Sequence, residues 1–118
     1  TKYRTLRAEA ALAAQQYDVA IADFELLLKE TPQSSRLLQG LGLAQVGKGN
    51  APAALAIFNP LVAQSPNAAA YYGRAMAHLK AGNKEASLKD LDQTIALEPG
   101  NPRYRDIRAQ IAADRAPR

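Results

Sequence analysis

Ala20-Ile21-Ala22-Asp23-Phe24 leads to Pro32, and two later stretches repeat this pattern: Ala54-Leu55-Ala56-Ile57-Phe58 before Pro66, and Ser87-Leu88-Lys89-Asp90-Leu91 before Pro99. The three prolines lie 34 and 33 residues apart. A fixed period of this length is typical of stacked repeats, in which each unit completes its core only against its neighbours. Such a stack usually works by displaying a surface, so a binding groove is expected before an active site.

Apolar residues recur every three or four positions, which predicts amphipathic helices along the whole chain. The expected ranges are about 2–15, 18–30, 35–47, one that starts near Pro52, 68–81, 84–97 and 102–113. Ser34 or Ser35 can cap the third helix and Asn101 the seventh. Pro60 lies inside the fourth, where its ring should clash with the carbonyl group of Ala56 and kink or split the helix.

The predicted fold class is all-α, a right-handed α-solenoid of three helix–turn–helix repeats with a capping helix. One domain is expected over residues 1–118, with repeats at about 1–34, 35–67 and 68–101, a capping helix at 102–113 and a frayed tail at 114–118. In the last helix, Tyr104, Ile107 and Ile111 should face inward, while the outer face is polar.

The pattern resembles the tetratricopeptide repeat, a helix–turn–helix unit of about 34 residues. The resemblance covers residues 2–99, and 102–113 correspond to the usual solvating helix. It rests on small residues at the eighth place (Ala8, Gly42, Ala75) and the twentieth (Ala20, Ala54, Ser87), a bulky residue at the twenty-fourth (Phe24, Phe58, Leu91), and the three prolines. Arg4 and Arg7 depart from it, because apolar residues are common at those places.

The composition excludes several classes of protein. Of the 118 residues, 47% are hydrophobic and none is Cys, so neither a thiolate zinc site nor a disulfide framework can form. No apolar run approaches the ~20 residues of a membrane span, and the first residues lack the apolar core of a signal peptide. The absence of Cys suits a bacterial cytoplasm and a periplasm equally. The missing initiating Met fits a processed chain or a fragment.

Residues that could carry chemistry have simpler structural explanations. Gly42–Gly49 imitates a G-x-x-x-x-G-K phosphate loop, but Gly49 stands where Ser or Thr would hold magnesium, and a helix is expected there. His78 is the single histidine and has no cluster of metal ligands around it. Asp90 and Asp92 should point to different faces of one helix. We therefore predict a protein that is not an enzyme and needs no metal or cofactor.

The resemblance implies a concave surface lined by the first helix of each repeat. Carried over place by place, it predicts a peptide-binding groove formed by Leu6, Leu12, Arg36, Gln39, Leu43, Val46, Tyr72, Met76, Leu79 and Lys80. Gly40, Gly47 and Gly73 should leave room for a ligand to approach closely. Lys2, Arg36, Lys80 and Arg105 are expected to form a basic rim.

One function known in the family is disfavoured by the same places. Chaperone-binding members hold a peptide carboxylate with Lys, Asn and Arg side chains, whereas this chain has Thr5, Glu9, Gly40, Ala69 and Gly73 there. The glutamate would repel a carboxylate, so capture of chaperone C-termini by this clamp is not expected.

The predicted function is a protein–protein interaction scaffold that binds an amphipathic helix or an apolar peptide segment of a partner. An acidic flank on that segment would match the basic rim. The alternative is self-association, or intramolecular docking within a larger assembly protein, so a homo-oligomer stays open. The net charge of +4 concentrates at the two ends. Nucleic acid is disfavoured because only Tyr104 offers a stacking platform beside the Arg residues, and no small-molecule substrate is expected.

Overall fold

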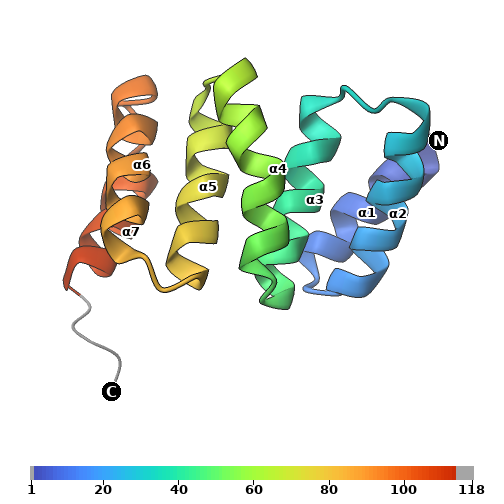
Figure 1. The fold of residues 1–118 in the computed structure, drawn as a ribbon, viewed down its shortest axis with the longest axis horizontal. Helices are drawn as coiled ribbons and strands as arrows, with labels where there is room; N and C mark the ends of the chain where they lie inside the picture. Colours follow the sequence, from blue (N-terminus) through green and yellow to red (C-terminus); the bar gives the residue numbers. More distant parts are fainter. Residues whose placement is uncertain (1, 114–118) are drawn as a thin grey trace.

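Seven helices and their connecting loops make up residues 2–113, the part of the chain that this computed structural model describes (Figure 1). Their bounds are α1 Lys2–Ala13, α2 Tyr17–Glu30, α3 Ser35–Lys48, α4 Ala51–Gln64, α5 Ala68–Lys80, α6 Lys84–Leu97 and α7 Pro102–Ala113. The predicted ranges of the last two agree with the structure residue for residue, and the others differ by one or two residues at an end. The frayed tail predicted for 114–118 lies outside the described residues.

Short polar side chains fix where the helices begin. Each accepts a hydrogen bond from a backbone N–H group of the first turn, which would otherwise lack a partner. The caps are Ser34 for α3, Asn50 for α4, Asn67 for α5, Asn83 for α6 and Asn101 for α7, with donor–acceptor distances of 2.8 to 3.3 Å. A cap recurs at the start of each of these helices, so the boundaries follow from local sequence.

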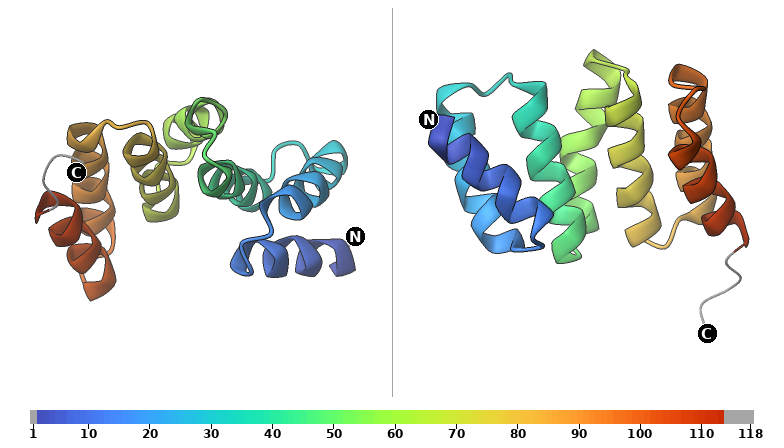
Figure 2. Two further views of the ribbon diagram at one scale, coloured as in Figure 1. Left: turned by 90° about the horizontal axis from the view of Figure 1, so that it is seen from below. Right: turned by 180° about the vertical axis from the view of Figure 1, so that it is seen from behind.

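The helices stack side by side in chain order (Figure 1). Seen from below, the stack curves into an arc with α1 at one end and α7 at the other (Figure 2, left). Contacts of α1 with α3, and of α3 with α5, show that the first helices of successive pairs lie next to one another. The chain is therefore an all-α solenoid, as predicted.

Two buried phenylalanines pack where neighbouring helices cross. Phe24 and Phe58 are 1% and 0% exposed. A Cβ atom added at Gly40 would lie under 3.0 Å from the Phe24 ring, and one added at Gly42 or Gly73 would lie equally close to the Phe58 ring. Glycine is thus needed where a ring from a neighbouring helix fills the space of a side chain, as predicted for Gly42.

Pro60 does not interrupt its helix. α4 continues from Ala51 to Gln64, so of the two expected outcomes, a kink or a split, the split does not occur. Leu61 and Val62, which directly follow the proline, are 6% and 8% exposed and belong to the same core cluster as Phe58. Burial of these side chains holds the last turn in place, and it outweighs the single backbone hydrogen bond that the proline removes.

Arg7 and Arg74, at the seventh place of the first and third repeats, form ion pairs within their own repeats. Arg7 donates two hydrogen bonds of 2.7 Å to Asp23, and Arg74 donates two of 2.9 Å to Asp90. Hydrogen bonding from Arg7 lowers the pKa of the Asp23 carboxyl group, and hydrogen bonding to Asp90 raises the pKa of Arg74. These bidentate contacts satisfy both carboxylates, which are almost fully buried.

In the second repeat, apolar side chains occupy the two places that hold the arginine and the aspartate in the other repeats. Leu41 and Ile57 stand at the two places that the arginine and aspartate hold in the first and third repeats. Leu41 belongs to the first core cluster, and Ile57 packs against that cluster. The same two places thus hold an Arg–Asp pair in the first and third repeats and a Leu–Ile pair in the second.

Candidate binding groove

A hollow of about 550 Å³ is lined mainly by apolar side chains. Four helices contribute to it besides the first residue of α2. The lining residues are Leu12 from α1, Tyr17 from α2, Leu43, Val46 and Gly47 from α3, Tyr72, Met76, Leu79 and Lys80 from α5, and Arg103 from α7. We call this hollow the groove.

Seven of the ten residues predicted for a peptide site line the groove: Leu12, Leu43, Val46, Tyr72, Met76, Leu79 and Lys80. Leu6, Arg36 and Gln39 do not. Leu6 is 60% exposed at the α1 end of the stack. Arg36 donates two hydrogen bonds to Glu9, and Gln39 lies 3.5 Å from the carbonyl oxygen of Ala69.

The sixth place of a repeat faces the preceding helix and not the groove, which explains the position of Leu6. Gly40 and Gly73 occupy this place in the later repeats, and both are buried against the phenylalanine of the preceding repeat. The expectation that these glycines leave room for a ligand was wrong, because the rings of Phe24 and Phe58 already fill that room.

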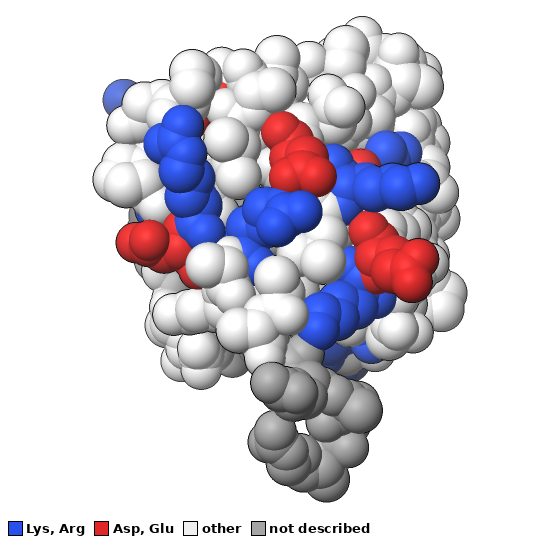
Figure 3. Space-filling model, turned by 90° about the vertical axis from the view of Figure 1, so that its left-hand side faces the viewer, with Lys and Arg blue, Asp and Glu red and all other residues white. Residues whose placement is uncertain are grey.

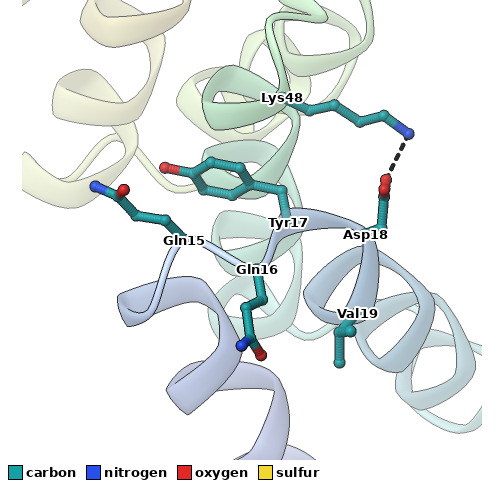
Figure 4. A pocket seen from close by; sticks show the side chains of 6 residues that line it. All are labelled: Gln15, Gln16, Tyr17, Asp18, Val19 and Lys48. Atoms are coloured by element: carbon teal, nitrogen blue, oxygen red, sulfur yellow. Dashed lines mark ion pairs between the residues drawn. The ribbon is translucent and has the colours of Figure 1, made fainter.

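The space beside Gly47 is also filled by a neighbouring ring. A Cβ atom at this position would lie under 3.0 Å from the Tyr17 ring. Figure 4 shows Tyr17 at the turn between α1 and α2, with its ring directed toward the helix that carries Lys48. Beside it, Lys48 and Asp18 form an ion pair of 2.6 Å. Sequence reasoning missed Tyr17 as a groove residue, although the glycine opposite it was the available signal.

The cationic part of the groove differs from the predicted rim. Lys80 and Arg103 line the groove, and no ion pair joins either of them to another residue among 2–113. Arg36 is paired with Glu9, and Arg105 is exposed but does not line the hollow. The register of α7 accounts for the last difference: Pro102 takes the first place of a repeat, so Arg103 takes the second.

Tyr72, which lines the groove, is in aromatic contact with Tyr104 of α7. The ring centroids of Tyr72 and Tyr104 lie 5.6 Å apart, with their planes inclined at 46°. Burial is the main cause that raises the pKa of the Tyr104 hydroxyl above its ordinary value. The lining of the groove thus includes two aromatic side chains, Tyr17 and Tyr72, beside its aliphatic residues.

The residues that were considered as possible catalytic or ligand-binding groups have structural roles. His78 is partly buried, with its Nε2 atom 3.8 Å from Asp90, and Asp92 faces solvent on another side of α6, where it pairs with Arg108. The phosphate-loop imitation lies within α3 and its C-terminal cap. Across residues 2–113, no three His, Asp or Glu side chains gather to hold a metal ion. None of the described helices has the length and apolarity needed to cross a membrane.

Comparison with known proteins agrees with this architecture. The family model described as tetratricopeptide repeat matches residues 5–69, 40–102 and 72–116. The chain belongs to the tetratricopeptide repeat family. Repeats of this family generally act as non-catalytic scaffolds for protein–protein interaction, and no catalytic family is indicated.

Two similar proteins extend the comparison. Cellulose synthase operon protein C of Pseudomonas fluorescens (strain SBW25) is 28% identical over 109 residues, which are 89% of this chain but only 8% of that protein. The NMR structure of the first tetratricopeptide repeat domain of human RPAP3 superposes with a TM-score of 0.82 at 21% identity, covering 92% of this chain and 87% of that one. The second likeness concerns the fold alone.

Proposed function

We propose that the groove binds one amphipathic helix or extended apolar segment of a partner protein. The observation that carries this proposal is the groove itself, an open hollow of about 550 Å³ with apolar side chains from α1, α3 and α5 on its floor. Met76 and Tyr72 are only partly buried, and Leu79 is 38% exposed. Half-exposed apolar side chains that face one hollow gain free energy when a partner removes them from water.

The two cations at the edge of the groove suggest the charge of the partner. Lys80 comes from the last turn of α5 and Arg103 from the first turn of α7, and both line the groove. A segment with an acidic residue beside its apolar face would place opposite charges together, which favours one orientation and faster association. An acidic flank is therefore part of the proposal.

Affinity capture of partners from extracts of the source organism tests the site. The chain is compared with Met76→Glu, which introduces a charge into the groove floor, and with Leu26→Glu, which introduces the same charge at a 42% exposed leucine that does not line the groove. We expect Leu26→Glu to retain the partner and Met76→Glu to lose it, with at least about a tenfold loss of affinity, equivalent to 1.4 kcal/mol. Equal retention by both variants would contradict the proposal.

The nature of the bound segment needs a second measurement. Once a partner is captured, overlapping synthetic peptides from it are titrated against the chain. The peptide that binds should gain helical circular dichroism or remain extended, and neutral replacements of its acidic flank should weaken binding and reduce its salt dependence. A binding peptide that is polar throughout would contradict an apolar groove as the site.

A further inference from the structure

We propose that Gln15 is a binding residue at the edge of the groove, and that its side-chain oxygen accepts a hydrogen bond from a backbone N–H group of an extended partner segment. This role rests on the proposed function of the groove and selects one of its two kinds of occupant, the extended one. Gln15 lies in the turn between α1 and α2, outside the helices from which a peptide site was predicted.

The first evidence is the backbone conformation of Gln15. Its φ angle is 64°, and among residues 2–113 it is the one non-glycine residue with a positive φ angle. The equivalent fifteenth places of the second and third repeats hold Gly49 and Gly82, with φ angles of 92° and 86°. A glutamine at this place meets a steric penalty that glycine avoids. Strain of this kind is typical of residues whose side chain has a function.

No contact within the described chain accounts for this side chain. Gln15 is exposed, and its backbone N–H group donates to the carbonyl oxygen of Leu12 at 3.1 Å. Its side-chain amide forms no hydrogen bond with any other residue among 2–113. The amide is therefore available to a ligand.

The side chain of Gln15 stands beside the groove. Tyr17 lines the groove, and it also lines a second hollow of about 370 Å³ together with Gln15. Figure 4 shows the side chains of Gln15 and Tyr17 extending to the same side of the turn, whereas Gln16 extends in another direction. The Tyr17 ring is seated against Gly47, which holds it in place between the two hollows. A segment that follows the groove across this ring meets the Gln15 amide.

The other groups of the groove explain why an acceptor is needed there. Lys80 and Arg103 only donate hydrogen bonds, and the aliphatic side chains neither donate nor accept them. A backbone N–H group that is buried against this lining without an acceptor costs free energy. Apart from the hydroxyl groups of the tyrosines, the side-chain oxygen of Gln15 is the acceptor that such a group meets at the edge of the groove.

This need for an acceptor distinguishes an extended occupant from a helical one. In a helix, the N–H groups beyond the first turn already bind carbonyl groups of the same segment. In an extended segment, the N–H groups have no such partner and must find one on the surface that buries them. An amide acceptor beside an apolar lining therefore favours an extended segment, with apolar side chains that rest on Leu43, Val46 and Met76.

The far end of the stack offers a ligand a different chemistry. Lys, Arg, Asp and Glu side chains intermix over the α6–α7 end (Figure 3), including the Arg108–Asp92 ion pair. Charged groups discriminate between the side chains of a ligand, whereas a neutral amide binds the backbone N–H group that every residue except proline carries. Gln15 therefore acts on the conformation of the partner segment more than on its sequence.

The test uses the complete chain and peptides of known sequence. Random dodecapeptides displayed on phage are selected on the chain, and a peptide whose affinity falls at least tenfold on Met76→Glu is synthesised. In a series of further peptides, each backbone N–H group in turn is replaced by an N-methyl group. Affinities are measured by isothermal titration calorimetry on the original chain, on Gln15→Gly and on Gln16→Asn. The last variant is the matched control, because Gln16 makes no cap hydrogen bond whereas Asn50 and Asn83 do so at the same place.

We expect Gln15→Gly to weaken the unmodified peptide about tenfold, equivalent to 1.4 kcal/mol. One N-methyl peptide should lose affinity on the original chain and bind Gln15→Gly as well as the unmodified peptide does. Gln15→Gly should also raise the midpoint of urea unfolding, because glycine relieves the strain, so the weaker binding is not a loss of folding. Gln16→Asn should raise the midpoint and leave the affinity unchanged.

Three results would overturn the role of Gln15 while leaving the groove as the site. They are equal affinity of the original chain and Gln15→Gly, an N-methyl loss of the same size on both, and a selected peptide that becomes helical in circular dichroism when it binds. If no selected peptide depends on Met76, the groove is not the site, and the proposed function is overturned together with the role of Gln15.

Discussion

Gly73→Ala should destabilise the protein, although alanine is the better helix former. Gly73 is buried in α5, and an added Cβ atom would lie under 3.0 Å from three atoms of the Phe58 ring. That ring is 0% exposed and is also in contact range of Gly42, so it has no space into which to move. Overpacking lowers the free energy of unfolding by about 1–3 kcal/mol, whereas the higher helix propensity of alanine raises it by about 1 kcal/mol. The net loss should be about 1 kcal/mol.

The same substitution should become stabilising when Phe58 is replaced by leucine. Leucine lacks the Cε and Cζ atoms that approach Gly73 most closely, and the third repeat already uses Leu91 at this place. With the collision removed, Gly73→Ala should gain about 1 kcal/mol from helix propensity. The coupling energy of the double-mutant cycle should therefore be about 2 kcal/mol.

Urea unfolding followed by far-ultraviolet circular dichroism measures all four free energies of unfolding in this cycle. Gly100→Ala serves as the control, because no atom lies within 4 Å of a Cβ at that position, and its effect should be equal in both backgrounds. A loss from Gly73→Ala of the same size beside leucine as beside phenylalanine would refute the account of a ring seated on glycine.

Two further predictions concern the ion pairs. Arg74→Leu should lower the free energy of unfolding in urea by about 3 kcal/mol, because it leaves the buried Asp90 carboxylate without its arginine partner. Adding Asp90→Ile should restore that free energy to within about 1 kcal/mol of the original value. A double variant as unstable as the single one would contradict this. Lowering the pH below about 4 should reduce stability, because the Asp23 pKa is lowered in the folded state and its contribution is lost as the carboxyl group protonates. In Asp23→Asn, the urea midpoint should depend less on pH across this range, and an unchanged slope would refute the assignment.

The fold could be predicted because its signals are local. The proline period gave the repeat length, and Ser34 and Asn101 marked helix starts that the structure confirms. Small residues at the crossings were recognised for the same reason, since they recur at fixed places. Pro60 is the exception among local signals, because burial of the following residues, which is a tertiary effect, overrides its local preference.

The contacts between helices were harder to infer. Arg7 looked like a departure from the family pattern, and its partner Asp23 lies sixteen residues later on another helix. Glycines at the sixth place suggested empty space, whereas the phenylalanine of the preceding repeat fills it. In both cases the residue types at two contacting places change together from one repeat to the next. This relation is not visible when each residue is considered separately. The groove residues remain a prediction that binding experiments must test.

The way the helices touch has a mechanical consequence. Among residues 2–113, each helix contacts its neighbours in the chain, with added contacts only between α1 and α3 and between α3 and α5, so no contact ties α1 to α7. Small rotations at successive crossings therefore add along the arc. The curvature of the whole stack, and with it the width of the groove, therefore depends on the sum of these rotations.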